Sequence, residues 1–239
     1  MGGIVIKGCE VFRQGVFVSA DVEVLDGIVT RIQPGIVPGE GVSVYNFDNC
    51  LVVPGLVDVH VHLREPGFSY KETIASGTGA AARSGYAAVC AMPDLSPVPE
   101  DAATLAQELD IIERDAVIDV LPYGAITRGE RGAELADMTA MAPRVCGFSD
   151  DGHGVQSPEL MRAAMLEAKR LGKPIAAHCE DNSLLRGGYI HDGDYARSHG
   201  HRGICPSLSG APSRGTPGSC ARPAAPTTSA TSRRRRARR

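Results

Sequence analysis

Short apolar runs alternate with helix-like segments between residues 52 and 179, and this rhythm restricts the possible folds more than any other feature. Strand-like runs lie near 52–61, 86–92, 117–123, 145–149 and 174–179, and helix-like segments lie near 72–84, 100–114, 130–141 and 157–171. Such alternation produces a parallel sheet with right-handed crossovers. No Gly-x-Gly-x-x-Gly motif follows a strand, which argues against a dinucleotide-binding sheet.

The first fifty residues have a different rhythm, in which short β-like runs are separated by turn signals. Asp26-Gly27 between the runs 21–25 and 28–32 predicts a hairpin, and we expect residues 1–51 to form a small antiparallel β unit. A closed (β/α) barrel requires about eight units of roughly 30 residues. Residues 52–205 have room for five such units. The residues therefore predict an α/β fold preceded by a small β unit, and both an open doubly wound sheet and a TIM-type barrel agree with this pattern.

Residues 206–239 differ in charge from the rest of the chain, since they hold eight Arg and no acidic residue. Residues 1–205 hold 17 Lys and Arg against 28 Asp and Glu. The tail is rich in Pro and Ser and nearly free of large aliphatic residues, so we expect it to be disordered. It would either bind nucleic acid electrostatically or be the product of a GC-rich coding sequence read out of frame, and we favour the second interpretation.

Cysteine usage and hydropathy predict the compartment. The seven cysteines are scattered and form no Cys-x-x-Cys pair. The amino terminus lacks an apolar stretch of signal-peptide length, and no stretch approaches the ~20 apolar residues of a membrane span. We expect a cytoplasmic protein with reduced thiols and no membrane partner.

Metal-ligand residues recur at the carboxyl ends of three predicted strands. His60 and His62 lie two residues apart on one strand, so both imidazoles point to one face and can meet one cation. Asp150-Asp151 follows the run 145–149, and His178 follows 174–177. Because parallel α/β folds bind ligands at this edge, the sequence predicts a metal site there. Spacing alone does not choose between Asp150 and Asp151.

The segments around these residues resemble the amidohydrolase superfamily in its cyclic-amidase branch, and the class I, bacterial-type dihydroorotases in particular. The resemblance extends over about residues 1–204 and rests on the segments 53–67, 71–74, 80–86, 91–93, 148–152 and 177–184. It implies the metal-dependent hydrolase fold, which here would be an α/β fold with an incomplete TIM-type (β/α) barrel preceded by a small β unit. It also implies a pair of zinc ions, with His60 and His62 as ligands of the first, Asp151 as the bridging carboxylate and His178 as a ligand of the second.

The resemblance also implies a substrate-binding group made of His62, Arg64 and Asp94. Arg64 resembles the residue that holds the substrate carboxylate, a role suited to a guanidinium. Family members usually carry Asn at the position of Asp94. An amide can donate to a carboxylate whereas an ionised Asp would repel it, so this departure is expected to weaken substrate binding unless Asp94 is protonated or turned away from the substrate.

The implied reaction is the reversible, zinc-dependent cyclisation of N-carbamoyl-L-aspartate to L-dihydroorotate in pyrimidine (UMP) biosynthesis. Related hydantoinases use a carboxylated lysine as the bridge, and no Lys precedes Asp150 on its strand, which favours dihydroorotase. Two alternatives stay open. One is another cyclic amidase of the hydantoinase or allantoinase kind, and the other is a non-catalytic dihydroorotase-like scaffold.

The family takes its catalytic acid/base aspartate and a further zinc histidine from later strands, so no catalytic residue is assigned in this chain. We therefore expect a fragment with little activity on its own. The expected small-molecule partner is dihydroorotate or N-carbamoyl-aspartate. The macromolecular candidates are a second copy of the chain, as in a homodimer, and an aspartate transcarbamoylase.

Overall fold

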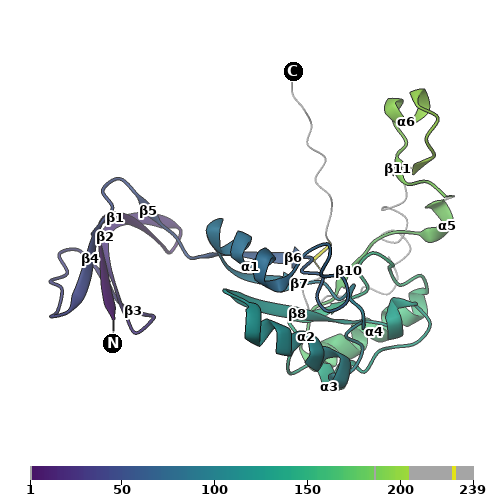
Figure 1. The fold of residues 1–239 in the computed structure, drawn as a ribbon, viewed down its shortest axis with the longest axis horizontal. Helices are drawn as coiled ribbons and strands as arrows, with labels where there is room; N and C mark the ends of the chain where they lie inside the picture. The colour runs from purple at the N-terminus through teal and green to yellow at the C-terminus, as the bar shows by residue number, and fades with distance from the viewer. Residues whose placement is uncertain (1, 186, 205–227, 230–239) are drawn as a thin grey trace. The chain divides into compact units, whose positions relative to one another are not determined.

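The chain forms two compact units, Met1–Gly55 and Leu56–Arg239. The structure is a computed structural model that describes residues 2–185, 187–204 and 228–229 (Figure 1). The predicted domain boundaries after residues 51 and 205 stay predictions. The predicted disordered tail, 206–239, lies outside the described residues apart from Thr228–Ser229. Within the described ranges, no helix has the length and apolar character needed to cross a membrane.

The first unit is a five-stranded sheet with the strand order β3-β2-β1-β4, and β5 also pairs with β1. The strands are β1 (Gly3–Arg13), β2 (Val16–Leu25), β3 (Ile28–Gln33), β4 (Val42–Asn46) and β5 (Leu51–Val52). The predicted hairpin is confirmed, since β2 and β3 pair antiparallel across Asp26 and Gly27, whose φ angles are 51° and 80°. β4 and β5 run parallel to β1, so the unit is mixed rather than purely antiparallel.

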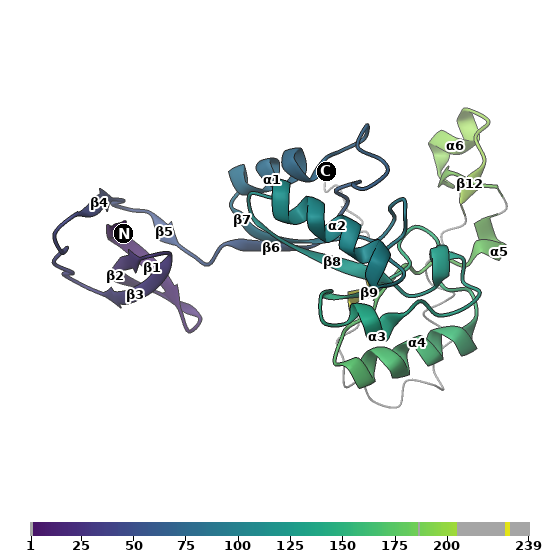
Figure 2. The same ribbon diagram turned by 60° about the horizontal axis from the view of Figure 1, so that its bottom comes forward.

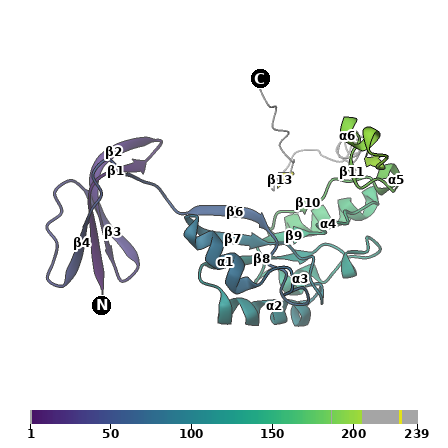
Figure 3. The same ribbon diagram turned by 45° about the horizontal axis from the view of Figure 1, so that its top comes forward.

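The second unit is built on a parallel sheet of four strands in the order β6-β7-β8-β9, which Figure 3 shows side by side. The strands are β6 (Leu56–Val61), β7 (Tyr86–Ala91), β8 (Asp119–Ala125) and β9 (Gly147–Ser149). A bridge between Phe148 and Ile175 places β10 (Ala176–Ala177) next to β9. The curled, open sheet confirms the predicted incomplete (β/α) barrel.

The main helices follow the strands in alternation, and each contacts the next along the sheet (Figure 2). They are α1 (Ile74–Arg83), α2 (Ala102–Asp115), α3 (Met138–Met141) and α4 (Pro158–Leu171). The shorter elements are η1 (Arg128–Glu130), α5 (Asn182–Leu185), β11 (Ile190–His191), α6 (Asp194–Ser198), β12 (Gly203–Ile204) and β13 (Thr228–Ser229). β11 pairs with β12, and β10 pairs with β13.

Local signals set the ends of α4 as the sequence predicts. The Ser157 side chain accepts a hydrogen bond from the Leu160 amide at 3.2 Å, and Pro158 occupies the first turn. Gly172 ends the helix with a φ of 68°, in the left-handed region that favours glycine. The helix covers the main apolar core of the unit through buried Ala164 and Ala168, which belong to the same cluster as Phe148.

Three predicted elements are wrong in extent, and one of them is the predicted strand 174–179, of which only Ala176–Ala177 is a strand. The predicted strand 52–61 is divided, because Leu51–Val52 pairs with β1 in the first unit and only Leu56–Val61 joins the barrel sheet. Pro54-Gly55 lies between them and interrupts pairing. The predicted helix 130–141 shrinks to α3, preceded by the turn η1. Gly129, Glu130 and Gly132 adopt φ angles of 57°, 56° and 67°, which a right-handed helix cannot contain.

Candidate metal centre

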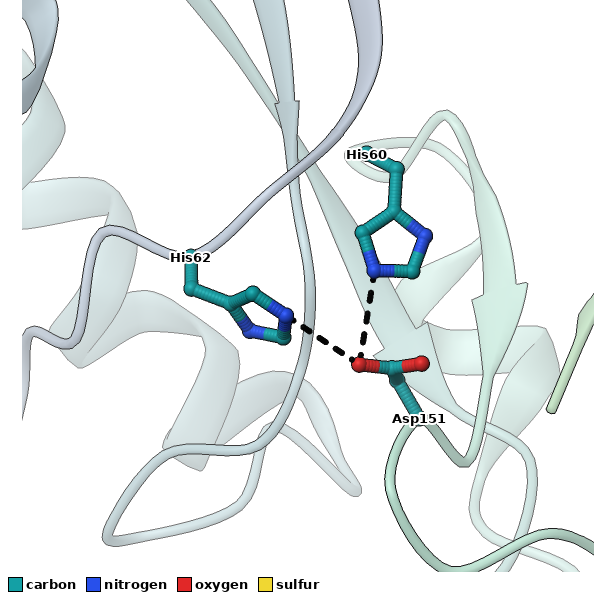
Figure 4. Close-up of side chains that lie close together, drawn as sticks. All are labelled: His60, His62 and Asp151. Carbon is teal, nitrogen blue, oxygen red and sulfur yellow. Dashed lines mark ion pairs between the residues drawn. The ribbon is translucent and has the colours of Figure 1, made fainter. Parts of the chain in front are cut away.

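His60 and His62 face one carboxylate from the end of β6. The Nε2 atoms of His60 and His62 lie 3.4 Å and 3.3 Å from Asp151 Oδ2 (Figure 4). The side-chain ligand atoms of the three residues all lie within 4.8 Å of one another. Alternation along the strand puts both imidazoles on one face, as the sequence predicts. The neighbouring parallel strands bring Asp151, which follows β9, to the same edge of the sheet.

His178 approaches the same carboxylate from the other side. Its Nδ1 lies 3.4 Å from Asp151 Oδ1, and its Nε2 lies 3.3 Å from Glu180 Oε2. The buried Nε2 forms no hydrogen bond of good geometry with the described residues. His178 does not belong to the compact group of His60, His62 and Asp151. His60 and His62 therefore face one carboxylate oxygen of Asp151, and His178 faces the other.

The structure distinguishes the two neighbouring aspartates. Asp150 Oδ1 accepts hydrogen bonds from the amides of Ile126 and Thr127 at 2.8 Å and 2.9 Å, and its Oδ2 accepts one from the Thr127 hydroxyl. Asp150 thus binds the loop after β8, while Asp151 faces the histidines. The sequence alone does not decide which of these two adjacent aspartates faces the histidines.

Burial and charge act in opposite directions on the acidic groups of the site. Burial works to raise the pKa of Asp151, but the His178 contact and the charges of His60 and His62 hold this pKa below its ordinary value. The Asp151 contact raises the pKa of His178, although burial opposes it. A carboxylate that stays ionised among imidazoles suits the binding of a divalent cation.

Arg64 and Asp94 are joined to this centre through His62. Asp94 Oδ1 lies 2.8 Å from His62 Nδ1, and Asp94 Oδ2 forms an ion pair with Arg64 Nη1. The Arg64 backbone has a φ of 62°, in the left-handed region. The three residues predicted to bind substrate thus lie together. However, the Asp94 carboxylate is paired with the Arg64 guanidinium that is predicted to bind the substrate.

Sequence reasoning missed two acidic groups beside the site. Glu180 contacts His178. Its position two residues after that histidine is the only sequence feature that could have indicated this contact. Glu130 is 4% exposed in the turn η1. Burial raises the pKa of Glu130 to about 8, and the charges of Asp150, Asp94 and Asp151 contribute. No sequence pattern marks this glutamate as buried, because the surrounding residues are polar and glycine-rich.

Comparison with solved structures supports the fold. A D-hydantoinase from Bacillus sp. AR9 matches with a TM-score of 0.71 at 20% identity, over 91% of this chain and 49% of that chain. A dihydropyrimidinase from Brevibacillus agri matches with a TM-score of 0.65 at 18% identity, over 87% of this chain and 47% of that chain. At such identities the match shows the amidohydrolase barrel fold alone.

Sequence comparison is more specific. The chain is 45% identical to a dihydroorotase of Fusobacterium nucleatum over 206 residues, covering 86% of this chain and 48% of the relative. It is 43% identical to a dihydroorotase of Staphylococcus aureus strain Mu50 over 200 residues, covering 83% and 47%. The chain thus spans about half the length of the curated relatives it matches. Residues 49–216 match the model of the Dihydro-orotase-like family, and the chain belongs to that family.

Proposed function

We propose that this chain contributes the amino-terminal half of a zinc-dependent dihydroorotase. The reaction is the reversible interconversion of L-dihydroorotate and N-carbamoyl-L-aspartate in pyrimidine biosynthesis. One observation carries the proposal, which is the meeting of His60, His62 and His178 on the two oxygens of Asp151. The sequence similarity to dihydroorotases supports the choice of substrate.

The donor set fits zinc. Imidazole nitrogen and carboxylate oxygen are both zinc ligands, and the compact group supplies two of the first kind and one of the second. His178 supplies a further imidazole on the other side of the carboxylate, where its Nδ1 lies 3.4 Å from Asp151 Oδ1. His60, His62 and Asp151 would hold one ion, and Asp151 and His178 a second. Bound zinc supplies Lewis acidity, which polarises a carbonyl and activates water.

The other residues of the site would bind and orient the substrate. Arg64 has guanidinium donors beyond the one engaged by Asp94, and these suit the substrate carboxylate. Asp94 would limit that interaction through its charge. Asp150 would fix the loop after β8 and so the position of the adjacent Asp151. No residue of this chain is assigned as the proton carrier.

Hydantoinase-like or allantoinase-like activity and a non-catalytic scaffold remain the alternatives. Among the described residues Asp151, and not a lysine, lies between the histidines, which favours dihydroorotase over a hydantoinase. A homodimer, an association with aspartate transcarbamoylase and a cytoplasmic location stay predictions from the sequence.

The decisive experiment uses a chimera in which residues 1–204 are followed by the remaining part of the Fusobacterium nucleatum relative. We expect zinc-dependent hydrolysis of L-dihydroorotate that is faster than hydrolysis of hydantoin or allantoin. A preference for either of these neutral rings, or no zinc binding, would contradict the proposal.

The same assay on the 239-residue chain checks the low activity expected from the sequence. Copurification with aspartate transcarbamoylase tests the scaffold alternative.

A further inference from the structure

The carboxylate of Asp94 connects two side chains that approach the centre from the loop after β6. Its Oδ1 lies 2.8 Å from His62 Nδ1, and its Oδ2 is paired with Arg64. The side chain of Asp94 is 20% exposed, so the contacts are partly shielded from water. Both oxygens of one carboxylate are therefore engaged, and the carboxylate plane is fixed from two sides.

This contact determines which nitrogen of His62 faces Asp151. An ionised carboxylate only accepts hydrogen bonds, and the 2.8 Å contact with Asp94 is the only side-chain hydrogen bond that His62 forms with the described residues, so we expect the neutral imidazole to carry its proton on Nδ1. The lone pair is then on Nε2, which lies 3.3 Å from Asp151 Oδ2. A metal ligand must present a lone pair, so His62 is held ready to bind through Nε2.

His60 provides an internal comparison. Its Nε2 lies 3.4 Å from the same oxygen of Asp151, but its Nδ1 has no side-chain hydrogen-bond partner among the residues that the structure describes. One histidine of the pair is oriented by a second carboxylate and the other is not.

We propose that Asp94 is a positioning residue, which fixes the tautomer and ring orientation of His62 for metal binding while Arg64 holds Asp94 in place. The inference rests on the proposed function for the identity of the metal, but the tautomer of His62 is a property of the metal-free chain. The order of influence is from Arg64 to Asp94 to His62. Asp94 therefore acts on the metal through a ligand rather than as a ligand.

The test combines Zn²⁺ affinity with nitrogen NMR of the histidine rings in the full chain without metal, in buffer alkaline enough for neutral imidazole. In the unmodified chain we expect His62 as the Nδ1–H tautomer. Asp94→Ala should convert His62 to a mixture of tautomers, leave the His60 signals unchanged, and weaken Zn²⁺ binding roughly 10- to 100-fold. Arg64→Met should cause a smaller loss, because Asp94 remains but is held from one side only.

Asp119→Asn is the matched control, since it removes an exposed carboxylate at the start of β8. Its Zn²⁺ affinity should stay within about twofold of the unmodified chain, as for a surface substitution. If Asp94→Ala does not fold, the near-isosteric Asp94→Asn replaces it, with a smaller loss of affinity and a weakened His62 hydrogen bond.

Two results would overturn the inference. One is a His62 that carries its proton on Nε2 in the unmodified chain. The other is a folded Asp94 variant whose His62 tautomer and Zn²⁺ affinity match those of the unmodified chain. Failure of the unmodified chain to bind Zn²⁺ would instead contradict the proposed function, and the His62 tautomer would still decide the role of Asp94.

Discussion

Thr127 and Asp150 are joined by two hydrogen bonds in the buried interior of the second unit. The Thr127 amide lies 2.9 Å from Asp150 Oδ1, and the Thr127 hydroxyl donates to Oδ2. Both residues are at most 1% exposed. The hydroxyl oxygen also accepts a hydrogen bond from the Gly132 amide at 2.9 Å. This network ties the loop after β8 to the end of β9, where the next residue is Asp151.

Replacing Thr127 by Val should therefore destabilise the second unit. The substitution keeps the shape of the side chain but leaves a carboxylate oxygen of Asp150 and the Gly132 amide without partners. Buried polar groups in that state cost about 1–3 kcal/mol. Denaturant unfolding of the full chain measures the loss. Ser69→Ala, at an exposed serine whose hydroxyl forms no hydrogen bond with the described residues, is the control and should change stability by less than about 0.5 kcal/mol. If both variants lower the free energy of unfolding by the same amount, the hydrogen-bond network around Thr127 does not contribute to stability.

Substitution of the proposed ligands should weaken zinc binding. Asp151→Ala removes the carboxylate that faces the histidines, and we expect Zn²⁺ affinity to fall by more than the roughly 10- to 100-fold typical of a residue that only orients a ligand. His60→Ala should have a similar effect. The measurement is competition with a chromophoric chelator.

The control for this series is His153→Ala, since His153 is close in the sequence to Asp151 but its side chain is 61% exposed and lies outside the compact group. Its affinity should match that of the unmodified chain. A loss as large as that of Asp151→Ala would show that the zinc bound in solution is not held by the proposed residues.

The parts of the structure that could be predicted from the sequence depend on local signals. Ser157 and Pro158 mark the start of α4 and Gly172 marks its end, and Asp26-Gly27 marks the turn of a hairpin. Alternation along one strand suffices to put His60 and His62 on one face. Such features need no knowledge of the rest of the chain.

The remaining features depend on contacts between distant segments. Asp94 meets His62 across 32 positions of sequence, and Asp150 meets Thr127 across 23. Neither contact has a spacing that a local pattern could reveal. The predicted helix 130–141 is wrong over residues 130–132, which form a turn in which Glu130 and Gly132 have left-handed φ angles of 56° and 67°.

Stability of the first unit should decrease in acid through Glu23. Its carboxylate accepts hydrogen bonds from Arg31 and from the Thr30 hydroxyl, and these lower the pKa of Glu23 to about 2. A group with a depressed folded pKa stabilises the folded state fully above its unfolded value, here 4.5, and loses that contribution as the pH falls toward 2.

Hydrogen exchange of the β2 and β3 amides in the full chain measures this effect across that pH window. Glu23→Gln should flatten the pH dependence of amide protection, because the neutral amide does not titrate. Glu10→Gln, at an exposed position of β1, should leave the dependence as in the unmodified chain. An unchanged slope in the Glu23 variant would mean that other carboxylates cause the acid sensitivity.

Glu108 should make the second unit less stable as the pH rises. This residue of α2 is 2% exposed, and its Oε2 has no hydrogen-bond partner within the described part of the chain. Burial raises the pKa of Glu108 well above the ordinary 4.5. The folded state therefore holds the proton more tightly than the unfolded state, so stability is full below pH 4.5 and falls as the pH rises toward the folded pKa.

Glu108→Met should remove this pH dependence of stability and, by deleting an unsatisfied buried oxygen, raise stability near neutral pH by about 1–3 kcal/mol. Glu113→Gln, at an exposed position of the same helix, should keep the slope. Denaturant unfolding at several pH values decides the matter, and a Glu108→Met variant with an unchanged slope and lower stability would show that the buried carboxyl has a partner that it needs.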